Sequence, residues 1–206
     1  MARKNPRYLA RNFAVSTLFA SLFLGFLTPT SADALVLVRP ATQWGNVYAG
    51  PASTANQTAK PKAAYLEKKS NIVVKYNNFP EWTKVQVQAA VDVWAANFES
   101  KVPIYIDATW GRSSSFSVLG SARAGSYFAN FPGAPDSSLW YPSALANALG
   151  GKDLDPENPE MVIQVNSVAN WNTRNDGSPR ANEYDLQSVF LHEMGHGLGF
   201  LSTDSY

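Results

Sequence analysis

The chain has 206 residues, no cysteine and two histidines, His192 and His196. Without cysteine there is no disulfide framework, no thiolate zinc cluster, no iron–sulfur site and no cysteine nucleophile. A composition that is 45% hydrophobic and 16% charged is typical of one globular domain, and a net charge of +1 gives no basic footprint for nucleic acid. Any imidazole chemistry must therefore use His192 or His196.

Residues 1–34 are typical of a secretory signal peptide. Four basic residues precede an uncharged, mostly apolar run over residues 13–27, and Ala32-Asp33-Ala34 supplies the small residues that a signal peptidase needs. We predict cleavage after Ala34, with Ala32 as an alternative. The competing interpretation is an uncleaved membrane anchor, because the uncharged stretch 12–32 is just long enough to span a bilayer.

Removal of the signal changes the charge balance. Loss of its four basic residues and Asp33 leaves 13 basic and 15 acidic side chains, a net charge of −2. The apparent basicity therefore belongs to the export signal. We expect a secreted protein without stable membrane insertion, held together by its core and not by disulfides.

The rest of the chain divides into an arm and a folded domain. Residues 35–70 are poor in regular pattern and rich in Ala, Thr, Gln, Pro and Gly, which predicts a linker or a loosely attached N-terminal arm. Residues 71–206 carry strand and helix patterns throughout. The β-branched run 72–76 predicts a strand, and Pro80 and Glu81 open a helix.

That helix and the segments after it predict an α/β crossover. Its apolar face, expected to pack in the core, comprises Val87, Val91, Trp94 and Phe98. A second strand over residues 103–110 makes the unit strand, helix, strand, which gives parallel neighbours in a sheet. We expect further strands around residues 118–119, 127–128 and 161–165, and a helix that begins at Pro142 and stops at Gly150-Gly151.

The chemistry lies near the C-terminal end of the chain. Asp185 is a candidate N-cap for an apolar helix that contains His192-Glu193-Met194-Gly195-His196. Residues four apart on a helix differ by about 40° in azimuth and about 6 Å in height, so both imidazoles lie on one face and can hold one metal ion. Glu193 follows the first ligand directly and can address a water on that ion, which is the arrangement for metal-assisted hydrolysis.

Glycines are unusually frequent in this helix. Gly195, Gly197 and Gly199 each cost about 1 kcal/mol in helix propensity. Their presence indicates a packing or turning requirement.

The pattern His192-Glu193-x-x-His196-x-x-Gly199 resembles the zinc-binding helix of the zincin metallopeptidases, and the trailing glycine resembles the metzincin branch. The wider context is similar to a group of secreted bacterial proteins assigned as zinc peptidases. The resemblance implies an α+β, zincin-like N-terminal subdomain: a twisted, mostly parallel mixed sheet, a backing helix and an active-site helix at its C-terminal end. It also implies that the strand at residues 161–165 is the edge strand that pairs with a peptide substrate.

The resemblance further implies a mechanism. His192, His196 and a third ligand would hold one catalytic Zn²⁺, and Glu193 would act as general base toward a zinc-activated water that attacks a peptide bond. Tyr184 and Arg180 are close enough in sequence to act as helpers, or else serve helix-entry packing and loop solvation. The partner would be a protein or peptide substrate. The sequence predicts neither the substrate preference nor the oligomeric state of the protein.

Two family features are missing. The third metzincin ligand would fall at Ser202, a poor ligand for zinc, and Asp204 is either a replacement or an ordinary loop carboxylate. Metzincins also have a methionine in a turn below the metal, downstream of the third ligand. The methionines here are Met1, Met161 and Met194, and none lies downstream of His196. We therefore expect an incomplete, C-terminally truncated form of a longer peptidase, one that binds zinc weakly and does not hydrolyse casein.

Two alternatives remain open. The chain could be a non-catalytic secreted binding or cell-wall-associated protein with a degenerate metal site, its Trp and Tyr side chains lining a binding surface. Against this, Trp94, Trp110 and Tyr76 fall at expected core positions. The acidic turn at Asp153 and Asp155 is either a calcium site or, as we prefer, a solvated turn.

Overall fold

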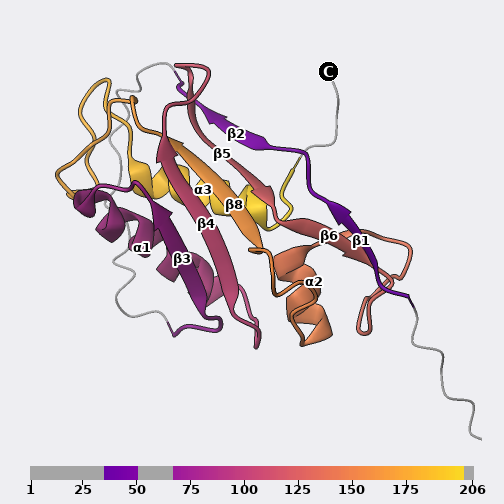
Figure 1. Ribbon diagram of the computed structural model, residues 1–206. Coiled ribbons are helices and arrows are strands. Elements are labelled where there is room, and N and C mark those ends of the chain that lie inside the picture. The colour runs from indigo at the N-terminus through magenta and orange to yellow at the C-terminus, as the bar shows by residue number, and fades with distance from the viewer. Residues whose placement is uncertain (1–34, 51–66, 202–206) are drawn as a thin grey trace, which may run out of the picture. The chain divides into compact units, whose positions relative to one another are not determined.

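The computed structural model describes residues 35–50 and 67–201. In these ranges the fold is α+β, with two sheets and three helices (Figure 1), which confirms the predicted class. The strands are β1 (Leu37–Pro40), β2 (Gly45–Tyr48), β3 (Ile72–Asn77), β4 (Ile104–Gly111), β5 (Val118–Ala124), β6 (Ser126–Ala129), β7 (Tyr141–Pro142) and β8 (Met161–Asn166). The helices are α1 (Glu81–Asn97), α2 (Ser143–Gly150) and α3 (Leu186–Gly197).

The predicted strand–helix–strand crossover is confirmed. β3 and β4 pair in parallel, with Ile72 opposite Ile104, and α1 connects them. Pro80 precedes the helix with φ −62° and so fixes the entry of the chain into its first turn. The helix buries Val87 and Val91 against the sheet, as their spacing predicts.

The larger sheet has the order β2-β5-β8-β4-β3. β3, β4 and β8 run parallel, whereas β5 is antiparallel to β8 and β2 is antiparallel to β5. The prediction that the strand at 161–165 lies at the edge and receives substrate is therefore wrong, because β8 lies at the centre. Its apolar run, with Met161, Ile163 and Val165 fully buried, is what a central strand of a covered sheet requires.

The segment predicted as a linker or arm contributes two strands. β2 forms one edge of the larger sheet, and β1 pairs with β6 in the smaller sheet of order β1-β6-β7. Each is four residues long and finds its partner seventy or more residues later in the chain. Strands this short in a Gly- and Pro-containing sequence give almost no local periodicity, so only the pairing reveals them.

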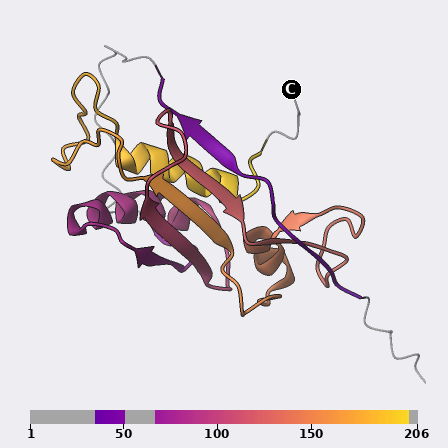
Figure 2. The ribbon, with the colours of Figure 1, turned by 45° about the horizontal axis from the view of Figure 1, so that its top comes forward.

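Both long helices cover one face of the larger sheet (Figure 2). The core between the layers contains the alternate residues of β4 and β8 together with Leu186, Phe190 and Met194 of α3. Trp94, Trp110 and Tyr76 pack against this core, in agreement with the prediction. On the opposite face Val73 and Tyr105 are exposed. The layer arrangement thus holds α3 directly beneath the sheet.

Several predictions concern residues outside the described ranges. They are the signal peptide over residues 1–34 with its cleavage after Ala34, and the candidate ligand positions Ser202 and Asp204. Among the residues that the structure does describe, no helix has the length and apolar character needed to cross a membrane.

Candidate metal centre

The helix that carries the histidines is anchored at its first turn. The carboxylate of Asp185 accepts a hydrogen bond from the backbone N–H of Ser188 at 2.7 Å, which confirms Asp185 as the N-cap. Leu186, Val189 and Phe190 then bury one face of α3 in the core. The burial fixes the rotation of the helix, and with it the direction in which residues 192–196 point.

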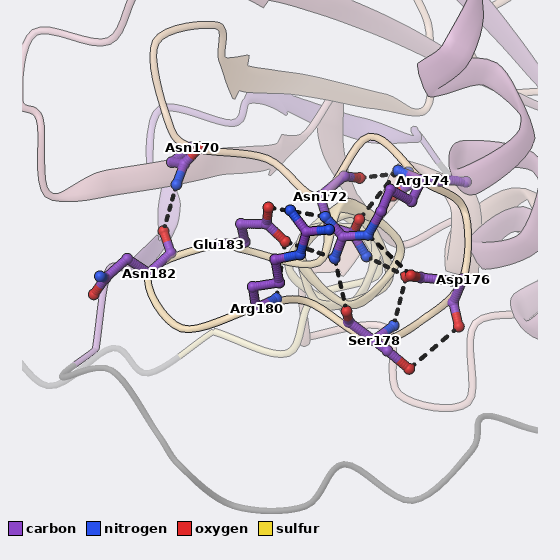
Figure 3. Close-up of polar contacts among 9 residues, drawn as sticks. Asn170, Asn172, Arg174, Asp176, Ser178, Arg180, Asn182 and Glu183 are labelled. Carbon is purple, nitrogen blue, oxygen red and sulfur yellow. Dashed lines mark hydrogen bonds and ion pairs between the residues drawn. The ribbon is translucent and has the colours of Figure 1, made fainter.

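The loop before this helix is also ordered by its own polar contacts (Figure 3). The guanidinium of Arg174 pairs with Asp176 at 3.0 Å and with Glu183 at 2.8 Å. Hydrogen bonds from Asn172, the Ser178 backbone and Arg174 lower the pKa of Asp176, and those from Arg174 and the Arg180 backbone lower the pKa of Glu183 to about 2. The carboxylates of Asp176 and Glu183 are therefore engaged in holding the loop itself.

The two predicted helper residues belong to this entry region. The Tyr184 ring packs edge-on against Trp171, with ring centroids 6.4 Å apart. Arg180 is exposed, and its backbone N–H donates to Glu183. These contacts are those of helix-entry packing and loop structure, the alternative roles that the sequence left open.

The histidine side chains meet as the spacing predicts. Nε2 of His192 lies 2.9 Å from Nε2 of His196, and the rings are nearly perpendicular, with their centroids 4.5 Å apart. Burial, and then the neighbouring His196, lower the pKa of His192, which favours the neutral imidazole that a metal needs. The two Nε2 atoms therefore converge on one point of the helix surface.

A backbone carbonyl orients the second imidazole. Nδ1 of His196 lies 2.7 Å from the carbonyl oxygen of Phe200. Because a carbonyl can only accept, we assign the ring hydrogen to Nδ1, which leaves the Nε2 lone pair directed toward His192. This second hydrogen bond is the kind that fixes the tautomer of a metal-ligating histidine.

The spacing of the two nitrogens fits a shared zinc ion. Tetrahedral zinc with Zn–N distances of about 2.0–2.1 Å would place two ligand nitrogens about 3.3 Å apart. The observed separation of 2.9 Å differs from this by a few tenths of an ångström. Residues 35–50 and 67–201 contain no group of three His, Asp or Glu side chains able to hold a metal. Within these ranges the candidate ligands that lie together are the pair His192 and His196.

Glu193 lies on the adjacent, buried side of the helix. Its side chain is fully buried, and Oε1 accepts a hydrogen bond from the backbone N–H of Val47 at 3.1 Å. Its other oxygen, Oε2, has no protein partner. Burial raises the pKa of Glu193 to about 8, against the opposing effect of the Val47 hydrogen bond. A carboxyl that titrates near neutrality can both accept and return a proton.

Neighbours of the site come from parts of the chain that the sequence did not connect to it. Gly45 of β2 lies against the His196 ring, and Gly120 of β5 lies against the Glu193 carboxylate. Sequence reasoning missed both, as well as Val47.

A shallow groove opens beside the histidines. It is lined by Trp94 of α1, by Phe200 just after α3, and by five residues of α3, namely Ser188, Leu191, His192, Gly195 and His196. The indole Nε1–H of Trp94 donates to the carbonyl of Leu191 at 2.9 Å and so ties α1 to the turn that carries His192. The histidine pair is therefore accessible, whereas Glu193 is covered.

The acidic turn considered for calcium is closed by its own hydrogen bonds. Asp153 accepts from the side chain of Asn147 and from the backbone N–H of Asp155, and Asp155 accepts from Asn158. These contacts agree with the solvated-turn interpretation, because the carboxylates cap backbone and amide donors.

The chain matches no protein-family model, no curated protein and no solved structure. The functional interpretation therefore depends on the geometry of the site and on the resemblance of its motif to the zincins.

Proposed function

We propose that the protein is a secreted zinc-dependent endopeptidase with a zincin-like catalytic subdomain, in which His192 and His196 bind the metal and Glu193 is the general base. The observation that carries the proposal is the convergence of two imidazole Nε2 atoms, 2.9 Å apart, on the helix that also carries a buried carboxylate. The position of this helix under a mixed sheet, with β3, β4 and β8 parallel, supports the zincin-like fold by analogy.

Each residue has one role. His192 and His196 present their Nε2 atoms to the metal, and the Phe200 carbonyl keeps the His196 ring in place. A bound zinc ion would supply Lewis acidity, lowering the pKa of a water molecule and polarising the scissile carbonyl. Glu193 would take the proton of the attacking water and pass it to the leaving amine, a transfer suited to its raised pKa.

The state of Glu193 favours an enzyme over an inert binding protein. A fully buried carboxylate with one unpartnered oxygen destabilises the fold, and an apolar side chain of the same size would avoid that cost. Perturbed carboxyls of this kind concentrate at functional sites. A protein that only displayed an aromatic binding surface would have no need for it.

The proposal is tested first by zinc binding. Competition with a chromophoric chelator should show one zinc ion per chain, bound weakly because the described residues supply two ligands. His192→Asn and His196→Asn should each abolish this binding. Glu193→Gln should retain it, as should Glu157→Gln, an exposed matched control. Zinc binding that survives replacement of both histidines would refute the proposal.

Hydrolysis is tested at saturating zinc with a quenched fluorescent peptide library. Any turnover above the metal-only background, by this chain or by a longer form, should fall by about 10²–10⁴ in Glu193→Gln, the range for loss of a general base, and remain unchanged in Glu157→Gln. Zinc binding without any turnover, in this chain and in C-terminally extended forms, would support the non-catalytic binding protein instead.

The proposed export is tested separately. Expression with residues 1–34 intact in a secreting host should yield a mature protein whose N-terminus is Leu35 or Asp33. Retention of Met1 in a membrane fraction would show the uncleaved anchor.

A further inference from the structure

The edge strand β2 lies on the candidate site. It pairs antiparallel with β5, with Gly45 opposite Ala122, Asn46 opposite Ser121 and Val47 opposite Gly120. In Figures 1 and 2 it is the edge strand of the larger sheet beyond β5, and it lies next to α3. A segment from the start of the described chain thus lies beside the helix at its end.

Alternate residues of β2 contact two different functional groups. The N–H of Val47 donates to Oε1 of Glu193 at 3.1 Å. Gly45 is so close to His196 that a Cβ atom added to it would overlap the imidazole ring. One strand therefore occupies the hydrogen-bonding position of the proposed base and also covers one metal ligand.

Few interactions attach β2 to the rest of the sheet. The strand has four residues, its register is interrupted between Val47 and Tyr48, and Tyr48 is 61% exposed. Two side-chain contacts add to the ladder: the Ser121 hydroxyl donates to Asn46 Oδ1 at 2.7 Å, and the Arg123 guanidinium lies over the Trp44 ring. An edge strand held in this way can exchange with another extended segment. The hydrogen bonds from β5 are made to main-chain atoms, so an extended segment of another sequence can form them too.

We propose that residues 44–49 are the internal occupant of a peptide-binding groove formed by the edge of β5 and by Glu193 and His196 of α3. The inference builds on the proposed function and adds the regulation of that site: seated β2 closes it, and displaced β2 opens it to an extended peptide in the same register. The contact of Gly45 with His196 requires the peptide residue at that position to be glycine.

The first test measures binding of a separate peptide to the metal-free full chain. The probe is a fluorescein-labelled peptide with the sequence of residues 43–50, followed by fluorescence anisotropy. Gly45→Ala should bind it at least tenfold more tightly than wild type, because the new Cβ unseats the chain's own strand. The matched control is Gly50→Ala, whose Cβ meets nothing within 4 Å and which should bind like wild type.

The second test locks β2 in place. Asn46 and Ser121 are opposite each other with their side chains in contact, a geometry that accepts a disulfide, and the chain has no other cysteine. Oxidised Asn46→Cys/Ser121→Cys should lose peptide binding, and reduction should restore the wild-type level. This variant decides the question even if Gly45→Ala does not fold.

Three results would overturn the inference. They are equal peptide binding by the oxidised and reduced forms, tighter binding by Gly50→Ala than by Gly45→Ala, and no binding by any folded variant, which would make β2 a permanent strand. None of these measurements uses zinc or turnover. Failure of the peptidase proposal, seen as absent zinc binding, is therefore distinguishable from failure of this inference.

Discussion

The backbone N–H of Val47 donates a 3.1 Å hydrogen bond to Oε1 of Glu193, a residue 146 positions later in the chain. The contact is the one protein hydrogen bond that the structure gives to this carboxylate among the described residues, since Oε2 has no partner. The environment of the proposed general base is therefore completed by β2 and β5, and substitutions in either strand should affect Glu193.

Gly120→Ala should disturb the site through the contact of β5 with Glu193. A Cβ at Gly120 would lie 2.8 Å from Oε1 and 2.9 Å from Cγ of Glu193, a contact that forces the buried side chain to move. We expect a loss of about 1–3 kcal/mol in unfolding free energy, measured by chemical denaturation. Gly111→Ala, at the end of β4, meets its nearest neighbour at 3.8 Å and should change stability by less than about 0.5 kcal/mol. Equal effects of the two substitutions would contradict the proposed contact.

The three glycines in and just after α3, Gly195, Gly197 and Gly199, meet different structural requirements. Gly199 has φ +100°, so it ends the helix with a turn that other residues resist. A Cβ on Gly197 would lie 2.7 Å from Sδ of the buried Met161, whereas one on Gly195 would meet its nearest neighbour, in Trp94, at 3.7 Å. The sequence predicted a packing or turning requirement for all three, and Gly195 shows neither.

Alanine substitution at positions 195 and 197 should therefore act in opposite directions. Gly195→Ala gains helix propensity, its Cβ makes an ordinary van der Waals contact with Trp94, and it should raise stability by up to about 1 kcal/mol. Gly197→Ala should lower the thermal midpoint because Met161 must leave its packed position. Thermal unfolding of the metal-free proteins measures both, and stabilisation by both substitutions would show that the helix does not pack closely on β8.

The local elements could be predicted because each carries its own pattern. The β-branched run at β3, the apolar stripe of α1 and the Asp185 cap are short-range signals that survive in the fold. Strand order is a long-range property. The apolar run of β8 indicated a strand, but only the pairing partners on both sides distinguish a central strand from an edge.

The candidate site divides in the same way. The meeting of His192 and His196 follows from helical spacing alone. The contacts that cover the site do not follow from helical spacing. Val47 and Gly120 contact Glu193, and Gly45 contacts His196, through sheet pairing across large sequence separations. Those residues are small or unremarkable in type, and their role lies in backbone position, which carries no side-chain signal.

The packing of α1 can be tested with one chemical change at two positions. Val91→Ala removes a buried side chain, 2% exposed, from the interface of α1 with the sheet, and should cost about 1.5–3 kcal/mol. Val85→Ala makes the same change on the same helix where the side chain is 62% exposed. It should be neutral or slightly stabilising, since alanine is the better helix former. Denaturant titration of both variants decides whether this face of the helix is buried.

The pH dependence of stability should report Glu160, a second buried carboxyl, remote in sequence from the histidines. Oε2 of Glu160 accepts from the backbone N–H of Tyr105 at 2.6 Å, and Oε1 accepts from Asn147 at 2.9 Å. Burial, the largest effect, raises the pKa of Glu160 above its ordinary value of 4.5, and the nearby charge of Asp153 acts in the same direction. The folded state therefore holds the proton of this group more tightly than the unfolded state does.

The sign of the effect follows from this difference in proton affinity. The stability contributed by protonated Glu160 is fully present below pH 4.5 and is lost as the pH rises through the raised pKa. Glutamine cannot ionise, so the unfolding free energy of wild type minus that of Glu160→Gln should decrease between pH 4.5 and pH 8. The carboxyl of Glu193 titrates in both proteins and cancels from this difference. Glu157→Gln, exposed on the same loop, controls for the change in net charge. A difference that grows with pH would mean that the hydrogen bonds from Tyr105 and Asn147 outweigh burial and that Glu160 is held as a carboxylate.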